Sequence, residues 1–220
     1  LRYLKTENRK RNITISGYPY GESSLEMKEK VTETKKIIKD KGAKFILLLI
    51  DNMHSMNEGL IQVMFTPELE KFYKKFIQWI LEDDEIGIIV KSKKPIVLDT
   101  LPQIHSVLEQ AEKTGRCYIV EDMFQTKPLD YAKVVDMVVA TGMFFSGGLV
   151  ESILTGARGL FYDYPNLHNI ETDLYSWGYK KVLFTDLDEM ISNLKAYKED
   201  RSSNSAFGDW SGHLDNLDPF

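Results

Sequence analysis

The chain has 220 residues, 43% hydrophobic and 11% aromatic, which is enough to bury a sizeable core in one large or two small domains. Its formal net charge of -5 argues against a general nucleic-acid-binding protein, because affinity for a phosphate backbone needs clustered cations. The single cysteine, Cys117, excludes an internal disulfide framework, the apolar stretches are too short to cross a bilayer, and no signal peptide is visible. We therefore expect a cytoplasmic protein that binds no nucleic acid and has no transmembrane segment.

Residues 1–44 predict a strand followed by a helix. Residues 12–20 (NITISGYPY) alternate between apolar and polar side chains, which is typical of a short strand. A helix is predicted over residues 25–40 and ends before Gly42. Lysines and arginines are frequent here, but acids are interleaved with them, which favours a solvated helix face. This region is either an extra layer on the domain that follows or the remnant of a preceding domain.

Strands and helices then alternate over residues 45–197. Apolar runs predict strands over residues 45–50, 86–90, 117–120, 134–140, 159–162 and 181–184. Helical repeats predict helices over residues 67–81, 101–113, 129–133, the segment after Gly148, and 187–197, with Asp186 as a cap. This series predicts a Rossmann-like, doubly wound α/β domain, with a mainly parallel sheet and helices on both faces. Residues 198–220 are predicted to be a tail without a closing element.

In such sheets ligands bind beyond the carboxyl ends of the strands. A turn of small residues, Ser146, Gly147 and Gly148, lies there between a strand and a helix. Glycine lets a phosphate approach the backbone, and the N–H groups that begin a helix bind anions. Glu151, one turn further on, is placed to accept hydrogen bonds from the hydroxyls of a ribose or sugar. The alternative is an ordinary strand-to-helix turn in which Glu151 only complements the helix dipole.

Cations follow a second strand at the same edge of the sheet. Lys91 and Lys93 lie in the run KSKKP, where they are candidates to hold a diphosphate or a carboxylate. The alternative is a solvated basic turn before Pro95. We favour Lys91, because it follows the strand directly, and Lys93 next.

Two further groups are candidates for acid–base chemistry. Glu121 and Asp122 end a strand and suit a general base, a ribose partner or a metal partner, although such pairs also cap helices and lie in water. His54 follows the first central strand and is the best placed of the four histidines. The histidines are far apart in the sequence and show no zinc-type spacing, so no metal site is predicted.

Three segments resemble a known family. FFSGGLVESILTGARGLFYDYPN (residues 144–166) resembles the donor-binding C-terminal half of GT-B-fold glycosyltransferases, in which such a turn, helix and strand hold the nucleotide sugar. IGIIVKSKKP (residues 86–95) is similar to the lysine-bearing strand end of the bacterial surface-polysaccharide transferases of this type, although their Lys-Pro-His-Pro version is absent. LLLIDNMHS (residues 47–55) also fits, and the resemblance covers about residues 45–197.

The resemblance implies a function and a site. It implies transfer of a sugar from a nucleotide donor to a glycan or lipid-linked acceptor during capsule or lipopolysaccharide synthesis, in the cytoplasm or at the inner membrane, without a cofactor or bound metal. It implies one half of a two-domain enzyme, with the second domain missing from this chain. It implies that Ser146, Gly147 and Gly148 lie at the donor phosphates. It also implies that Glu151 lies at the ribose or sugar, and that Lys91 or Lys93 lies at a phosphate or sugar acid.

Two alternatives remain at this level. A nucleotide-sugar 2-epimerase would use the same scaffold, but needs acids and a histidine that converge on the sugar. A non-catalytic binding module would keep the fold without the chemistry. The catalytic base, the sugar and the acceptor are not predicted.

Overall fold

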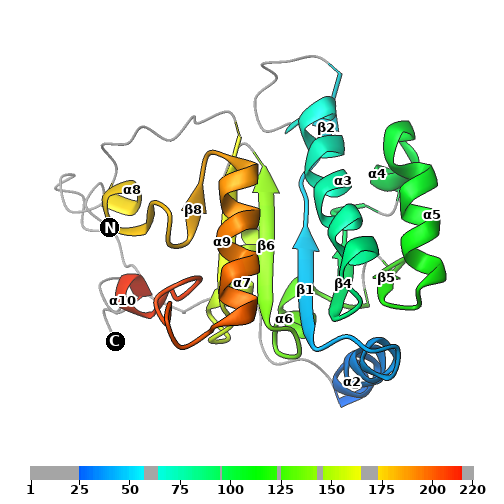
Figure 1. The fold of residues 1–220 in the computed structure, drawn as a ribbon, viewed down its shortest axis with the longest axis horizontal. Helices are drawn as coiled ribbons and strands as arrows, with labels where there is room; N and C mark the ends of the chain where they lie inside the picture. Colours follow the sequence, from blue (N-terminus) through cyan, green and yellow to red (C-terminus); the bar gives the residue numbers. More distant parts are fainter. Residues whose placement is uncertain are drawn as a thin grey trace, which may run out of the picture.

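The computed structural model describes residues 25–56, 64–94, 96–122, 125–142, 146–164 and 173–214. Within them, six parallel strands form one sheet in the order β5-β4-β1-β6-β7-β8 (Figure 1). The strand bounds are β1 Phe45–Ile50, β4 Ile86–Lys91, β5 Cys117–Ile119, β6 Met137–Gly142, β7 Gly159–Asp163 and β8 Leu183–Phe184. Every residue of β1, β4, β6 and β7 is buried, as expected for strands covered on both faces. The predicted parallel sheet is confirmed.

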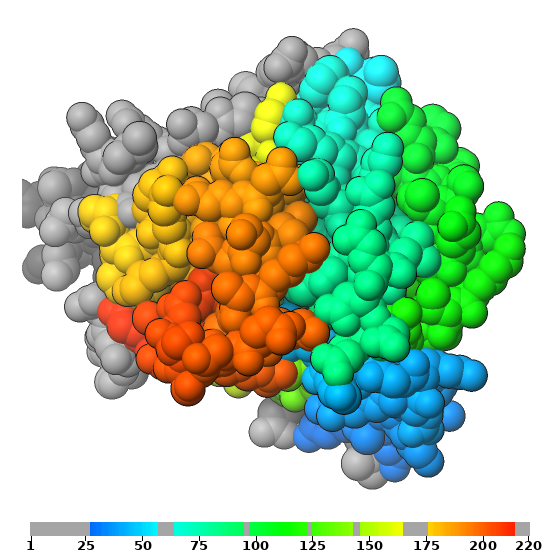
Figure 2. All heavy atoms as spheres, in the orientation of Figure 1, coloured from blue at the N-terminus to red at the C-terminus, as the bar shows by residue number. Residues whose placement is uncertain are grey.

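Helices cover both faces of the sheet. On one face lie α3 (Thr66–Glu82), α5 (His105–Lys113) and α9 (Leu187–Glu199), together with the short α4 (Ile96–Asp99) and η1 (Pro102–Ile104). Figure 2 shows α9 and α3 packed side by side over this face. On the other face lie α2 (Leu25–Asp40), α6 (Pro128–Ala132) and α7 (Gly147–Ile153). Among the described helices, none is long and apolar enough to cross a membrane.

Strand alternation divides the core into two clusters. Phe45, Leu47 and Leu49 of β1 point toward α3, and Ile46, Leu48 and Ile50 point to the opposite face. The predicted helical repeat of α3 is buried in the first cluster through Leu69, Phe72, Phe76 and Ile80. Each such side chain contributes about 1.5–3 kcal/mol when it is fully buried. The doubly wound architecture therefore follows from two periodicities, the alternation of side chains along a strand and the repeat of apolar side chains along a helix.

Some element boundaries differ from the predicted ones. The strand predicted from residue 134 begins at Met137, because the preceding Asp136 turns its carboxylate to the backbone N–H of Ile46 at 2.8 Å. The helix predicted over 101–113 is divided into η1 and α5, and α4 precedes them. The predicted loop after β1 contains β2 (His54–Ser55), which pairs with β3 (Met64–Phe65). The strand predicted over residues 12–20 lies outside the described residues.

The segments that flank the alternating series pack onto the sheet. In α2, Val31 and Ile38 belong to the second core cluster. After α9, whose predicted cap Asp186 accepts the N–H of Glu189 at 2.8 Å, the chain returns through Phe207 and Trp210, both buried. The Trp210 indole donates to the carbonyl of Gly159 at 2.8 Å. The predicted tail thus contains a packed segment and a further short helix, α10 (Ser211–Leu214); α8 (Asp173–Gly178) was also not predicted.

Candidate functional site

The strand order reverses between β1 and β6. The chain leaves β1 through α3 on one face and leaves β6 through α7 on the other, so the two connections diverge (Figure 1). The two strands are paired from Leu47 with Met137 to Ile50 with Ala140. In open α/β sheets a ligand crevice forms beyond the carboxyl ends of the strands at such a reversal. The candidate site is therefore the carboxyl edge of β1 and β6.

The Ser-Gly turn lies at this edge, and its two glycines have different surroundings. A methyl group on Gly148 would lie 2.9 Å from Cγ of Pro128 and 3.5 Å from Cγ2 of Ile50, so glycine allows α7 to pack closely against β1 and α6. Gly147 is exposed, and within the described ranges no heavy atom outside its chain neighbours and its own helix backbone lies within 4 Å of a Cβ placed on it. Ser146 is buried at the helix N-cap. Gly147 therefore leaves room for a ligand, whereas Gly148 serves packing.

Glu151 lies in the same short helix as the two glycines. It is half-buried, one turn beyond Gly147. Its position on α7 is compatible with the predicted contact to ligand hydroxyls and with a favourable interaction with the helix N-terminus.

A buried carboxylate follows β1 directly. Asp51 is 3% exposed; its Oδ2 accepts the Tyr73 hydroxyl at 2.7 Å, and its Oδ1 accepts the Lys93 backbone N–H at 2.6 Å. Ser92 Oγ lies 3.3 Å from the Tyr73 oxygen. Burial raises the pKa of Asp51 to about 6, and the hydrogen bonds only partly oppose this rise. No role is assigned to Asp51 from the sequence alone, although an acid placed directly after a wholly apolar strand was the available signal.

The two candidate lysines point to different places. The ammonium of Lys91 donates to the backbone carbonyl of Asp122, and Lys30 of α2 lies 2.8 Å from the Asp122 carboxylate. Lys91 is 6% exposed, and burial lowers its pKa. Lys93 is exposed, and its ammonium lies 3.0 Å from Oδ1 of Asn52, the second residue after β1. The structure therefore places Lys93 beside β1 at the strand-order reversal and Lys91 between the ends of β4 and β5.

The other acid–base candidates are engaged in local hydrogen bonds. Asp122 also accepts from the backbone N–H and hydroxyl of Thr126 at 2.8 and 2.7 Å; although burial acts to raise its pKa, these bonds and Lys30 hold it below the usual range. His54 Nδ1 and Nε2 lie 2.9 and 2.8 Å from the hydroxyls of Thr66 and Thr100. Burial lowers the pKa of His54. Both side chains thus join neighbouring segments of the structure, and Glu121 is exposed beside Asp122.

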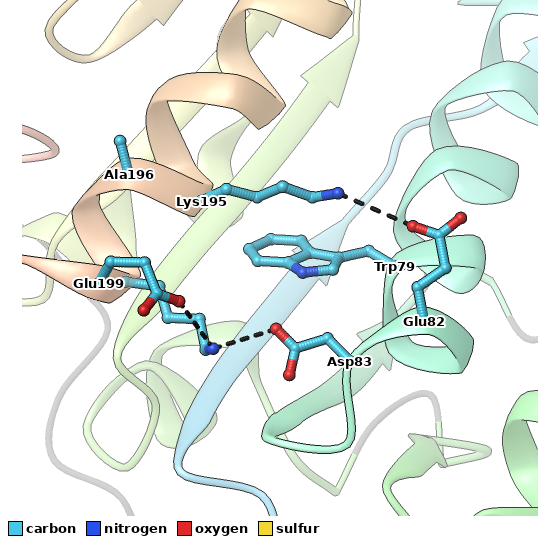
Figure 3. Close-up of a pocket in the computed structure, with 7 residues that line it drawn as sticks. Trp79, Glu82, Asp83, Lys195, Ala196 and Glu199 are labelled. Atoms are coloured by element: carbon cyan, nitrogen blue, oxygen red, sulfur yellow. Dashed lines mark hydrogen bonds and ion pairs between the residues drawn. The ribbon is translucent and has the colours of Figure 1, made fainter.

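A hollow of about 400 Å³ lies elsewhere, between the C-terminal halves of α3 and α9 (Figure 3). Lys195 lies 5.5 Å from the centre of the Trp79 ring and 3.8 Å from Glu82. Lys198 lies 3.0 Å from both Asp83 and Glu199. Because Asp83 leads into the start of β4, this hollow is at the amino edge of the sheet, and its two lysines are both paired with its acids. We interpret it as a link between two helices.

No cluster of three or more metal-ligating side chains (His, Cys, Asp or Glu) is found in the part of the chain that the structure describes. The thiol of Cys117 is buried, which raises its pKa to about 12. A buried thiol with a raised pKa is unreactive.

The strand order, with its reversal between β1 and β6, defines a Rossmann-like, doubly wound α/β domain. No family model matches the chain, and no curated protein matches its sequence. Among solved structures, the fold is similar to that of the C-terminal domain of a glycosyl transferase group 1 family protein (LpcC) from Francisella tularensis. The TM-score is 0.53 at 11% identity, over 80% of this chain and 87% of that chain. The predicted fold, that of the C-terminal half of a GT-B glycosyltransferase, is confirmed.

Proposed function

We propose that this domain binds the nucleotide-sugar donor of a glycosyltransferase that builds a bacterial surface polysaccharide. The observation that carries the proposal is the position of the Ser146–Gly148 turn at the reversal point of a sheet whose fold is that of a glycosyltransferase C-terminal domain. The open space at Gly147 supports it, because a phosphate needs close access to backbone N–H groups.

The proposal gives each residue at this edge a role. The N–H groups that begin α7 and the ammonium of Lys93 bind the donor diphosphate and stabilise the charge that grows on it as the glycosidic bond breaks. Glu151 accepts hydrogen bonds from the ribose or the donor sugar. Lys91 joins the ends of β4 and β5 beside the site through its contact with Asp122. The acceptor, a glycan or a lipid-linked sugar, and the base that deprotonates it are assigned to a second domain facing this edge.

A thermal-shift panel of CMP, UMP, UDP, GDP and dTDP, with their sugar conjugates, tests the proposal. A ligand at a hundred times its Kd adds about 2.7 kcal/mol of stability. For a chain of this size that corresponds to a rise in Tm of about 5–10 °C. A response to one nucleotide would identify the donor class, and silence across the whole panel would contradict the proposal.

Three variants locate the binding site on the surface. Gly147→Ala places a methyl group where the phosphate is expected, and Lys93→Ala removes the cation; each should weaken binding at least about tenfold without lowering the Tm of the free protein. Lys113→Ala removes another exposed lysine, on α5, which pairs with Glu109, and should bind as the unaltered chain does. Equal binding by all three variants would exclude the proposed site.

A further inference from the structure

We propose that Asp51 is a positioning residue of the donor site, whose carboxylate fixes the basic loop of residues 92–94 beside the ends of β1 and β6. The inference rests on the proposed function in so far as Lys93 binds the donor. Asp51 itself does not contact the ligand, because it is 3% exposed and both of its oxygens already accept hydrogen bonds.

The hydrogen bonds around Asp51 join three elements. The Tyr73 hydroxyl, from α3, has one hydrogen and donates it to Asp51 Oδ2 at 2.7 Å. Ser92, after β4, lies 3.3 Å from the Tyr73 oxygen, and its hydroxyl also interacts with the Asp51 carboxylate. The ionised carboxylate thus orders the side chains of Tyr73 and Ser92 together with the backbone of Lys93.

Lys93 is held at both its backbone and its side chain by the segment that follows β1. Its backbone N–H donates to Asp51 Oδ1 at 2.6 Å, and its ammonium donates to Asn52 Oδ1 at 3.0 Å. The first contact fixes where the side chain starts, and the second fixes where its charge lies. Both contacts hold Lys93 to the carboxyl end of β1. This strand pairs with β6 and therefore lies next to the Ser146–Gly148 turn.

The apolar pattern of β1 alone gives no reason for a carboxylate here. The six residues of β1 are all apolar and buried, and one more apolar side chain would continue that pattern without the desolvation of a charge. What the carboxylate adds is a fixed, hydrogen-bonded position for the loop that carries Lys93. A buried residue such as Asp51 can in this way keep a ligand-binding side chain, here Lys93, in a fixed position.

Amide hydrogen exchange followed by NMR tests the positioning directly and needs no ligand. In Asp51→Asn, which keeps the size of the side chain, exchange at the Lys93 amide should become about 10- to 100-fold faster, the factor expected when a charge-assisted hydrogen bond is weakened. Asp84→Asn, an exposed acid in the turn before β4, is the matched control and should leave this amide unchanged. Unchanged exchange in Asp51→Asn would overturn the proposal.

A double-mutant cycle then tests whether Asp51 acts through Lys93. With UDP and GDP as probes, Asp51→Asn should weaken binding about tenfold in the unaltered chain and should have no further effect in Lys93→Met. Equal losses in both backgrounds would mean a general structural role and would overturn the proposal. If neither probe nor any other nucleotide binds the unaltered chain, the proposed function fails, while faster exchange at Lys93 would still establish Asp51 as the positioning residue of the loop.

Discussion

The buried carboxylate of Asp51 should leave a measurable mark on the pH dependence of stability. Its pKa in the folded chain is about 6, against about 3.9 for an aspartate in an unfolded chain. Between these values the folded protein holds a proton that the unfolded protein releases, so this group's contribution to the free energy of unfolding falls as the pH rises from about 4 to about 6. A difference of about two pKa units corresponds to about 3 kcal/mol.

Urea unfolding of the unaltered chain and of Asp51→Asn, from pH 4 to pH 7.5, measures this contribution. Asparagine does not titrate, and the other carboxylates cancel in the difference between the two proteins. The free energy of unfolding of Asp51→Asn, relative to the unaltered chain, should therefore rise by about 3 kcal/mol across that range. The exposed control Asp84→Asn should show no such trend. A flat difference for Asp51→Asn, or one that falls with rising pH, would refute the reasoning, because hydrogen bonding would then outweigh burial at Asp51.

Three further predictions concern stability. Gly148→Ala should cost about 1–3 kcal/mol in denaturant unfolding, because its methyl group meets Pro128, whereas Gly147→Ala should cost nothing; equal effects would contradict the packing argument. Trp210→Phe removes the indole hydrogen bond to Gly159 and should cost about 1–3 kcal/mol; an unchanged Tm would show that the segment after α9 adds little. Lys198→Met leaves Asp83, Glu85 and Glu199 without their shared cation, so the Tm should fall most at low salt and neutral pH; a salt-independent loss would point to packing instead.

The sheet could be predicted because its signal is local. Runs such as residues 45–50 and 86–90 are apolar throughout, and only a strand covered on both faces suits so short a run bounded by polar residues. The segment after α9 could not be predicted, because in its described part, residues 200–213, only the side chains of Phe207 and Trp210 are strongly buried, and a glycine and an aspartate separate them. Two anchors at that spacing form no periodic pattern, yet Phe207 joins the first core cluster, and Trp210 joins the second and donates to Gly159 of β7.

The candidate site could be predicted in outline for a similar reason. Glycines after a strand and lysines before a proline are recognisable over a few residues, so the turn at Ser146–Gly148 and the basic loop were found. The difference between Gly147 and Gly148 depends on Pro128, and the role of Asp51 depends on Tyr73, which is 22 positions away in the chain. Such pairings exist only after folding, so the sequence pattern could not rank the members of each group.

Strand alternation, continued past the ends of the strands, accounts for the directions in which Asp51, Ser92 and Lys91 point. In β1, Phe45, Leu47 and Leu49 face α3, so Asp51 continues that side and meets Tyr73 of α3. In β4, Val90 faces the same side and is followed by Ser92, which also meets Tyr73.

Lys91 lies on the same side of β4 as Ile89 and therefore points toward α2. There it donates to the backbone carbonyl of Asp122, whose carboxylate also binds Lys30. Lys91, the last residue of β4, is thus turned away from the carboxyl edge of β1 and β6 by the alternation of side chains along the strand. Lys93, two positions on, has left the strand and is free of that constraint, so its direction is set by hydrogen bonds to Asp51 and Asn52. Position relative to the strand end, rather than charge, thus decides the direction of each lysine side chain.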